Sequence, residues 1–499
     1  MHGTCVGFGD ARNGVEEPVS ANQQKGRSMA TEIFSDVDAV VSGLEGALRI
    51  ERNGVEISDH GAVRDTLIDK LVWSAVFGEP HVQVASQWLV RQIATASGSW
   101  PASIHELYIA AGRDEYANVT TPAINLRGMT FDLARSVFRA AQATGSKQVI
   151  LELARSEMGY TEQRPGEYAT VVLAAAVKEG WNGPVFIQGD HYQANPKAYA
   201  KDPAAEIEAI ARLAAEAIGA GYGNIDIDAS TLVDLDLPTL KEQQEANYRN
   251  TAELIQRIRE IEPDGFRISI GAEIGEVGKT NSTVDDLEAF MEGYIAEMDR
   301  RSNEAGQEIV GISKISVQTG TSHGGVVLPD GSIKEVAVDF ETLGLLSEAA
   351  RTTYGIGGAV QHGASTLPES AFDRFATANA VEVHLATAFQ NVVYDSAAFP
   401  AELLDEIYAH LAANHDDERK PDQTDAQFYY TTRKRGFGPF KRQLWSLPEA
   451  TRTAIMDELQ PRFELIMREL KVAGRGNLVD RFVPRVDLTV PIPDVLARG

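Results

Sequence analysis

Eight short apolar runs alternate with longer stretches of helical periodicity through the middle of the chain. The runs are rich in Val and Ile, as strands are, and the intervening stretches repeat apolar residues every three or four positions. Strands that alternate with helices predict a parallel sheet. A count of eight favours a (β/α)8 TIM barrel, an α/β fold, over an open doubly wound sheet. The predicted strands are 122–126, 148–153, 184–189, 224–229, 266–273, 312–318, 357–362 and 381–385.

The barrel pattern leaves long segments on both sides. Residues 31–117 show only helical patterns and predict a helical N-terminal extension, whereas residues 1–30 are polar and predict a disordered leader. The barrel domain is expected over residues 118–398. Residues 399–499 predict a helical C-terminal extension that finishes in an extended, proline-bounded tail.

Charge and cysteine content limit the kinds of partner. The formal net charge is −26, so the surface repels phosphate backbones and binding to nucleic acid or an anionic membrane is not expected. Cys5 is the one cysteine, which excludes an internal disulfide and fits a reducing cytoplasm. No apolar stretch reaches the ~18 residues that suggest a membrane span.

Four of the ten histidines fall at the ends of predicted strands. In a TIM barrel the carboxyl ends of the strands carry the active site, so these four side chains converge on one rim. Three neutral imidazoles with an open fourth position suit a catalytic zinc ion. The alternative is that they form hydrogen bonds within the loops. The four are His191, His323, His362 and His384.

Seven motifs in a fixed order extend across the barrel region. They are "PAINLRGMTFDLARSVFRAA", "VFIQGDHYQ", "NIDIDAS", "GAEIGEVG", "VQTGTSHGG", "QHGAS" and "VEVHLATAF". In this order the sequence resembles the class II, zinc-dependent fructose- and tagatose-bisphosphate aldolases, over about residues 122–395. The resemblance implies reversible aldol cleavage of a phosphorylated ketose. The default substrate is fructose 1,6-bisphosphate, which gives dihydroxyacetone phosphate and glyceraldehyde 3-phosphate.

The resemblance also implies roles for individual residues. Three histidines would bind Zn2+, Asp190 would exchange a proton with the substrate hydroxyl, and Glu273 and Asp228 would approach the metal or a second cation site. The alternative for both acids is polar filling of the barrel mouth. The implied metal-ligand histidines are His191, His323 and His362. The implied contacts to substrate, phosphate or a monovalent cation (K+ or Na+) are Asn125, Gly324, Gly363, Ser365, Ala386 and Thr387.

Three departures from the family pattern concern the substrate side. The loop after "GAEIG" has no carboxylate near Asn281, where the family carries a catalytic Glu, so Glu276 or Asp285 could replace it, or another residue could protonate the enediolate. The eighth strand presents His384 instead of Asn, so His384 could donate a proton, contact a different substituent of the substrate, or only replace the hydrogen bonds of Asn. The Lys that commonly follows the "GTSHGG" turn is absent. The basic stretch "TRKRGFGPFKR", residues 432–442, could supply the missing cation, or it could be a solvated loop.

Other functions remain open at this point. Lys314 lies on one strand face with Ser316 and Gln318, and a buried Lys could form a Schiff base as in class I aldolases. A catalytically reduced barrel that supports a partner aldolase is another possibility, and so is a metal-dependent lyase or epimerase on a related sugar phosphate. The resemblance further implies a homodimer or homotetramer.

Overall fold

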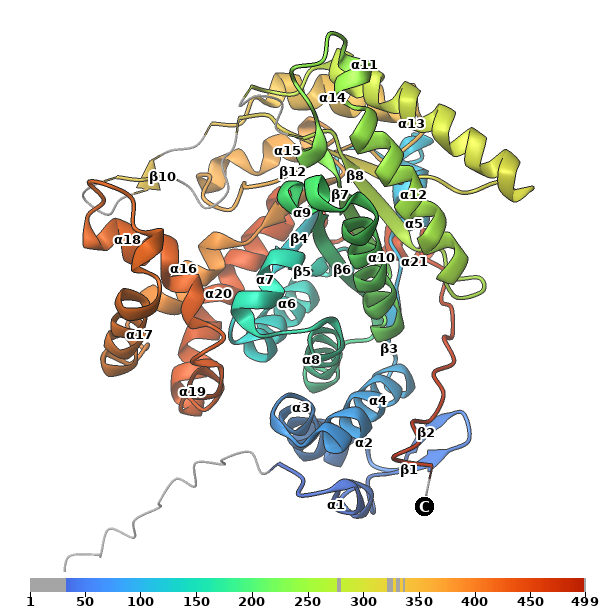
Figure 1. The fold of residues 1–499 in the computed structure, drawn as a ribbon. Helices are drawn as coiled ribbons and strands as arrows, with labels where there is room; N and C mark the ends of the chain where they lie inside the picture. Colours follow the sequence, from blue (N-terminus) through green and yellow to red (C-terminus); the bar gives the residue numbers. More distant parts are fainter. Residues whose placement is uncertain (1–32, 276–279, 321–325, 329–332, 335–336, 498–499) are drawn as a thin grey trace, which may run out of the picture.

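The computed structural model describes residues 33–275, 280–320, 326–328, 333–334 and 337–497. Its centre is a closed ring of parallel strands with helices around the outside (Figure 1). Strand order follows the chain, and the last strand pairs in parallel with the first. The TIM barrel expected from the sequence is therefore confirmed. Its strands are β4 (Thr121–Asn125), β5 (Ile150–Ala154), β6 (Gly183–Gln193), β7 (Asn224–Asp228), β8 (Ser269–Glu273), β9 (Lys314–Val317), β12 (Ala359–Gln361) and β13 (Glu382–Leu385).

Each of the eight predicted strands corresponds to one barrel strand, with ends that differ by a few residues. All residues of β4, β5 and β7 are buried, because side chains fill the barrel on one face and helices cover the other. An antiparallel pair, β10 (Val326–Val327) and β11 (Ile333–Lys334), follows β9.

Amphipathic helices cover the barrel, and local capping explains where several of them begin and end. Thr283 caps one helix through the backbone N–H of Asp286, and Gly145 ends another in a left-handed conformation. The helices are α6 (Thr130–Thr144), α7 (Arg155–Thr161), α8 (Pro165–Lys178), α9 (Pro196–Lys201), α10 (Pro203–Ala220), η2 (Ser230–Leu232), α11 (Leu240–Gln243), α12 (Glu245–Ile261), α13 (Val284–Ala305), α14 (Phe340–Thr352), η3 (Glu369–Ala371), α15 (Asp373–Thr377) and α16 (Thr387–Asp395).

The N-terminal extension contains strands as well as helices, so the prediction of helices alone was wrong. A two-residue turn joins β1 (Leu48–Glu51) to β2 (Gly54–Ile57) in a hairpin. The short β3 (Ser99–Ala102) pairs in parallel with the first half of β6, ahead of the point where β7 takes over that edge. Its four residues are too few to show a period in the sequence. The helices are α1 (Val37–Ser42), α2 (His60–Ala62), η1 (Val63–Leu67), α3 (Ile68–Phe77), α4 (Pro80–Ala96) and α5 (His105–Gly112).

The C-terminal extension is helical, as expected, and it packs on both the barrel and the N-terminal extension. α20 lies along α6 of the barrel, and the Trp445 ring meets Trp73 of α3 at a centroid distance of 5.7 Å. Beyond α21 the chain runs without regular structure to residue 497. In this segment the Val490 carbonyl oxygen accepts a hydrogen bond from the Trp88 indole N–H. The elements are α17 (Ala401–Asn414), η4 (Asp416–Glu418), α18 (Asp425–Thr432), η5 (Arg433–Gly436), α19 (Lys441–Trp445), α20 (Glu449–Glu469) and α21 (Gly476–Phe482).

Candidate active site

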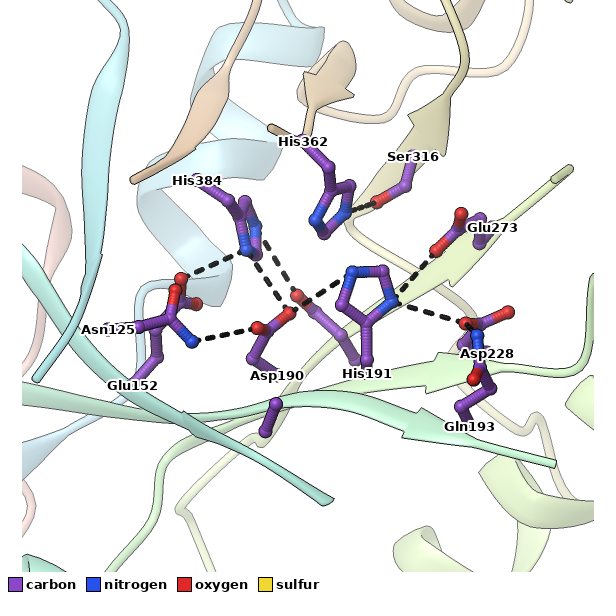
Figure 2. A network of polar contacts seen from close by, with 12 residues as sticks. Asn125, Glu152, Asp190, His191, Gln193, Asp228, Glu273, Ser316, His362 and His384 are labelled. Atoms are coloured by element: carbon purple, nitrogen blue, oxygen red, sulfur yellow. Dashed lines mark hydrogen bonds and ion pairs between the residues drawn. The ribbon is translucent and has the colours of Figure 1, made fainter. Parts of the chain in front are cut away.

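The predicted site residues that the structure describes gather at the carboxyl ends of the barrel strands (Figure 2). Asn125 ends β4, Asp228 ends β7 and Glu273 ends β8, while His362 follows β12 and His384 lies in β13. Asp190 and His191 come from the long strand β6. His323 and Gly324, and also Glu276, lie outside the described residues.

Three histidine side chains form one cluster across the rim. The ring centroids of His191 and His362 are 4.1 Å apart, and those of His362 and His384 are 4.0 Å apart. On β9, the Ser316 hydroxyl lies 3.1 Å from His362 Nε2. The structure thus brings together imidazoles that are 171 and 22 residues apart in the chain.

A bulge in β6 accounts for the placement of Asp190 and His191. Neighbours in a regular strand point to opposite faces of the sheet. Here the pairing of β6 with β7 shifts between Gly189 and Tyr192, and His191 has a left-handed φ of 42°. As a result His191 Nε2 lies only 3.7 Å from Asp190 Oδ1, and both side chains serve the same site.

Carboxylates fix the orientation of the His191 ring. Its Nδ1 lies 3.1 Å from Asp228 Oδ2 and 3.2 Å from Glu273 Oε2. Burial by itself would lower the pKa of His191, but Asp190, Glu273 and Asp228 together raise it well above its usual value. Metal-binding histidines typically donate their second N–H to a carboxylate in this way. The two predicted acids therefore lie on the Nδ1 side of His191.

The donor set fits a divalent metal ion. Asp190, His191 and His362 each offer one ligand atom, and the three atoms lie within 4.8 Å of one another. Imidazole nitrogen and carboxylate oxygen are the donors that zinc takes in catalytic sites. A second group of His191, Asp228 and Glu273 meets the same distance limit, so these acids could also approach a cation directly.

Asp190 is held through both of its carboxylate oxygens. The Asn125 side-chain N–H₂ donates to Oδ2 at 2.9 Å, and His384 Nδ1 lies 3.2 Å from Oδ1. Burial alone would raise the pKa of Asp190, but the neighbouring imidazoles of His191 and His384 hold it well below its usual value. Asp190 is therefore available as a carboxylate base in a fixed orientation.

Four buried ionisable side chains lie one layer deeper in the barrel, and of these the sequence reasoning singled out Lys314 and missed the three acids. Burial raises the pKa of Glu152 to about 8 and that of Asp226 to about 6, whereas Lys314 and His384 offset burial and keep Glu382 ionised with a lowered pKa. Asp226 and Glu382 each lie two positions before a polar site residue of the same strand, Asp228 and His384, a signal that could have revealed them. Glu152 has no such neighbour in β5. The four are Glu152, Asp226, Lys314 and Glu382.

Lys314 is an ion-paired cation and not a free amine. Its Nζ donates to Gln188 Oε1 at 2.8 Å and lies 2.9 Å from Asp226 Oδ1 and 2.5 Å from Glu382 Oε1. Burial would lower the pKa of Lys314, but the two carboxylates raise it overall. A protonated, fully enclosed amine cannot attack a carbonyl, so the geometry opposes Schiff-base chemistry at this residue.

The predicted phosphate contacts that the structure describes lie beside the start of α16. Gly363 has a φ of 71° in the turn after β12, and the Ser365 hydroxyl accepts a hydrogen bond from the Ala388 N–H at 3.4 Å. Ala386 and Thr387 form the first positions of this helix. A glycine turn and a helix N-terminus together present backbone N–H groups to an anion.

The cations of the basic stretch, residues 432–442, have two kinds of environment. Some pair with carboxylates within the protein, and others lie around the ring of Tyr160 near the site. Arg433 pairs with Asp395 and Lys441 with Glu167, so both are neutralised within the protein. Arg442 stacks on the ring of Phe77.

Lys434 and Arg435 lie with Arg127, which follows β4, around the ring of Tyr160. Arg127 and Arg435 each pair with a carboxylate, Glu157 and Glu418. Lys434 forms no ion pair with any carboxylate in the described part of the chain. Burial, Arg127 and Arg435 all lower its pKa. A string of hydrogen bonds from Asp190 through Asn125 and Glu157 to Arg127 places this basic cluster beside the site.

Within the described ranges, every helix is too short or too polar to span a lipid bilayer. A comparison with curated protein sequences gives no match.

Several solved structures are similar to the chain at low identity. The YdjI aldolase of Escherichia coli K12 is 14% identical, with a TM-score of 0.42 over 75% of this chain and 99% of its own. Campylobacter jejuni fructose-bisphosphate aldolase is 16% identical, with a TM-score of 0.44 over 74% and 97%. The fructuronate-tagaturonate epimerase UxaE of Cohnella laeviribosi is 13% identical, with a TM-score of 0.47 over 88% and 90%.

The sequence model of class-II fructose-bisphosphate aldolases matches residues 102–434. The matched region holds every barrel strand from β4 to β13 and the histidine cluster, and it ends at Lys434 of the basic cluster. The protein therefore belongs to the class-II fructose-bisphosphate aldolase family.

Proposed function

We propose that the protein is a zinc-dependent aldolase that reversibly cleaves a phosphorylated ketose, with fructose 1,6-bisphosphate as the default substrate. The observation that carries this proposal is the group of Asp190, His191 and His362, in which a fixed carboxylate stands beside two metal-ligand imidazoles. We further propose a cytoplasmic homodimer or homotetramer that holds a monovalent cation, K+ or Na+, near the turn of Gly363 and Ser365.

The residues of the chain have separate tasks in this proposal. His191 and His362, with His323, hold the metal, which supplies Lewis-acid polarisation of the ketose oxygens when it is bound. Asp190 takes the proton from the hydroxyl next to the bond that breaks, and in the reverse direction it returns that proton. The burial of Asp190 excludes water, which strengthens its interactions with the developing charge.

Two anion sites at different edges of the rim support a bisphosphate substrate. The turn of Gly363 and Ser365, with the N-terminus of α16, would bind the proximal phosphate through backbone N–H groups. Lys434 would bind the distal phosphate, flanked by Arg127 and Arg435. The second site would supply the cation that the "GGVVLPDG" segment lacks.

The proton on carbon needs a separate donor. Asp285, one candidate, is exposed in the first turn of α13, and Glu276 lies outside the described residues. The Asn281 side-chain amide donates a hydrogen bond to Asp339 at 3.2 Å, and an amide cannot donate the proton to carbon. We therefore assign Asp190 to the hydroxyl proton only.

Metal analysis combined with an assay of triose-phosphate release tests the proposal. The purified protein should contain zinc, lose turnover with a chelator and recover it with added zinc. His362→Ala should lose both metal and turnover, while His60→Ala, an exposed histidine of the N-terminal extension, should keep both. Cleavage that persists in a metal-free protein would refute the proposal.

A metal-dependent epimerase is the second candidate. Glu273 and Asp190 lie near opposite nitrogens of the His191 ring, so two carboxylates could serve opposite faces of a bound ketose. The same reaction mixture distinguishes the candidates, because an epimerase would give an isomeric ketose without triose phosphates.

A further inference from the structure

A continuous line of buried charged groups connects Lys314 to the proposed base Asp190. Lys314 Nζ lies 2.5 Å from Glu382 Oε1, and the same oxygen lies 2.6 Å from His384 Nε2. On the other side of the ring, His384 Nδ1 lies 3.2 Å from Asp190 Oδ1. The order is therefore lysine, glutamate, histidine, aspartate, with every member at most 4% exposed.

Glu382 is fixed from several directions and cannot turn away from His384. Its Oε2 accepts a 2.5 Å hydrogen bond from the buried Tyr108 hydroxyl, while Gln188 and Lys314 both donate to Oε1. Lys314 is fixed in turn by Asp226. Because Tyr108, Gln188 and Lys314 come from three separate elements and are all buried, the Glu382 carboxylate presents a rigid acceptor to the imidazole.

His384 faces carboxylates at both of its ring nitrogens. Its Nδ1 also lies 3.0 Å from Glu152 Oε1, and Asp226 Oδ2 lies 3.7 Å from Nε2. Asp190 at Nδ1 and Glu382 at Nε2 can each accept a hydrogen bond, so the ring has an acceptor at both nitrogens. The strong contact at Nε2 then determines where Nδ1–H points, which is toward Asp190 and Glu152.

We propose that Glu382 and Lys314 are positioning residues: they lock the His384 ring so that its Nδ1–H holds Asp190 in place for proton transfer. This inference rests on the proposed function, because it takes Asp190 as the base for the substrate hydroxyl. Lys314, a Schiff-base candidate from the sequence, thereby acts through Glu382 and His384 to hold the base Asp190 in position. Buried partners that orient a functional imidazole are commonly worth about 10- to 100-fold in activity.

The test compares two reactions of the zinc-loaded protein, only one of which needs Asp190. The first is cleavage of fructose 1,6-bisphosphate, followed by triose-phosphate release. The second is exchange of carbon-bound hydrogen of dihydroxyacetone phosphate in D2O, followed by NMR, which moves no hydroxyl proton to Asp190. The variants are Glu382→Gln, Lys314→Met and the double variant, with the exposed Glu216→Gln as control.

Glu382→Gln should lower kcat for cleavage by about 10- to 100-fold. The KM for cleavage, the zinc content and the rate of exchange should stay within about twofold of wild type. Glu216→Gln should match wild type in both reactions. Lys314→Met leaves a buried carboxylate without its cation, and if that variant or Glu382→Gln does not fold, the double variant removes both charges and should show the same selective loss.

Two results overturn the inference alone. One is that the wild type is active and Glu382→Gln, or the double variant, cleaves fructose 1,6-bisphosphate at the wild-type rate. The other is an equal loss of cleavage, exchange and zinc, which would show that the residues only support the fold. A zinc-loaded wild type that catalyses neither reaction would instead overturn the proposed function, and this inference with it.

Discussion

The basic cluster of Arg127, Lys434 and Arg435 leads to a quantitative prediction about substrate binding. Lys434 is half-buried, lacks a carboxylate partner among the described residues and faces two arginines across Tyr160. A cation in this state gains its counter-charge when a phosphate binds. Replacement by Met keeps an unbranched side chain of nearly the same length and removes the charge.

A hydrogen bond to a charged group contributes about 1.5–3 kcal/mol. Arg127 and Arg435 remain in Lys434→Met, so we expect a loss in the lower half of that range, about 2 kcal/mol, or roughly 30-fold in kcat/KM. The loss should appear in KM with little change in kcat, because the distal phosphate is bound equally in the ground and transition states.

Steady-state kinetics with two substrates provide the assay. Fructose 1,6-bisphosphate carries the distal phosphate and fructose 1-phosphate lacks it, so only the bisphosphate should respond to Lys434→Met. Lys441→Met is the matched control, since Lys441 already pairs with Glu167 at 2.6 Å. An equal loss for both substrates, or the same loss in Lys441→Met, would refute the reasoning.

Three further predictions concern stability. Burial lowers the pKa of His105 to about 3, below its unfolded value, so between pH 7 and pH 5 the wild type should lose about 2 kcal/mol of stability relative to His105→Gln; urea unfolding of both proteins at both pH values measures this difference, and the same pH dependence in the two would contradict it. Gly112→Ala should destabilise by about 1–3 kcal/mol, since the added Cβ would lie 2.3 Å from the Gly355 carbonyl oxygen; Gly159→Ala, with open space around the site, should not, and equal urea midpoints would contradict this. Lys314→Met should destabilise by about 3–5 kcal/mol because it leaves buried carboxylates uncompensated; a wild-type thermal midpoint would contradict it.

Much of the barrel and part of the site could be predicted from local patterns. The strand runs and helical stretches specify the (β/α)8 order, because side-chain periodicity is a property of consecutive residues. The barrel topology then brings strand ends together, and so Asp190, His191, His362 and His384 could be expected at one rim. The short β3 could not be predicted, since its pairing depends on an edge of β6 that is 84 residues away.

The sequence by itself determined the barrel and the kinds of side chain at its mouth, since both follow from residue order and strand polarity. Only the tertiary structure decided how those side chains are used. The bulge that aims His191 depends on the pairing of β6 with β7, and the line from Lys314 to Asp190 joins three strands, β9, β13 and β6. The basic stretch was visible in the sequence, but packing determined that Arg433 and Lys441 are neutralised and that Lys434 is not. These outcomes depend on distances between residues far apart in the chain, which no local pattern contains.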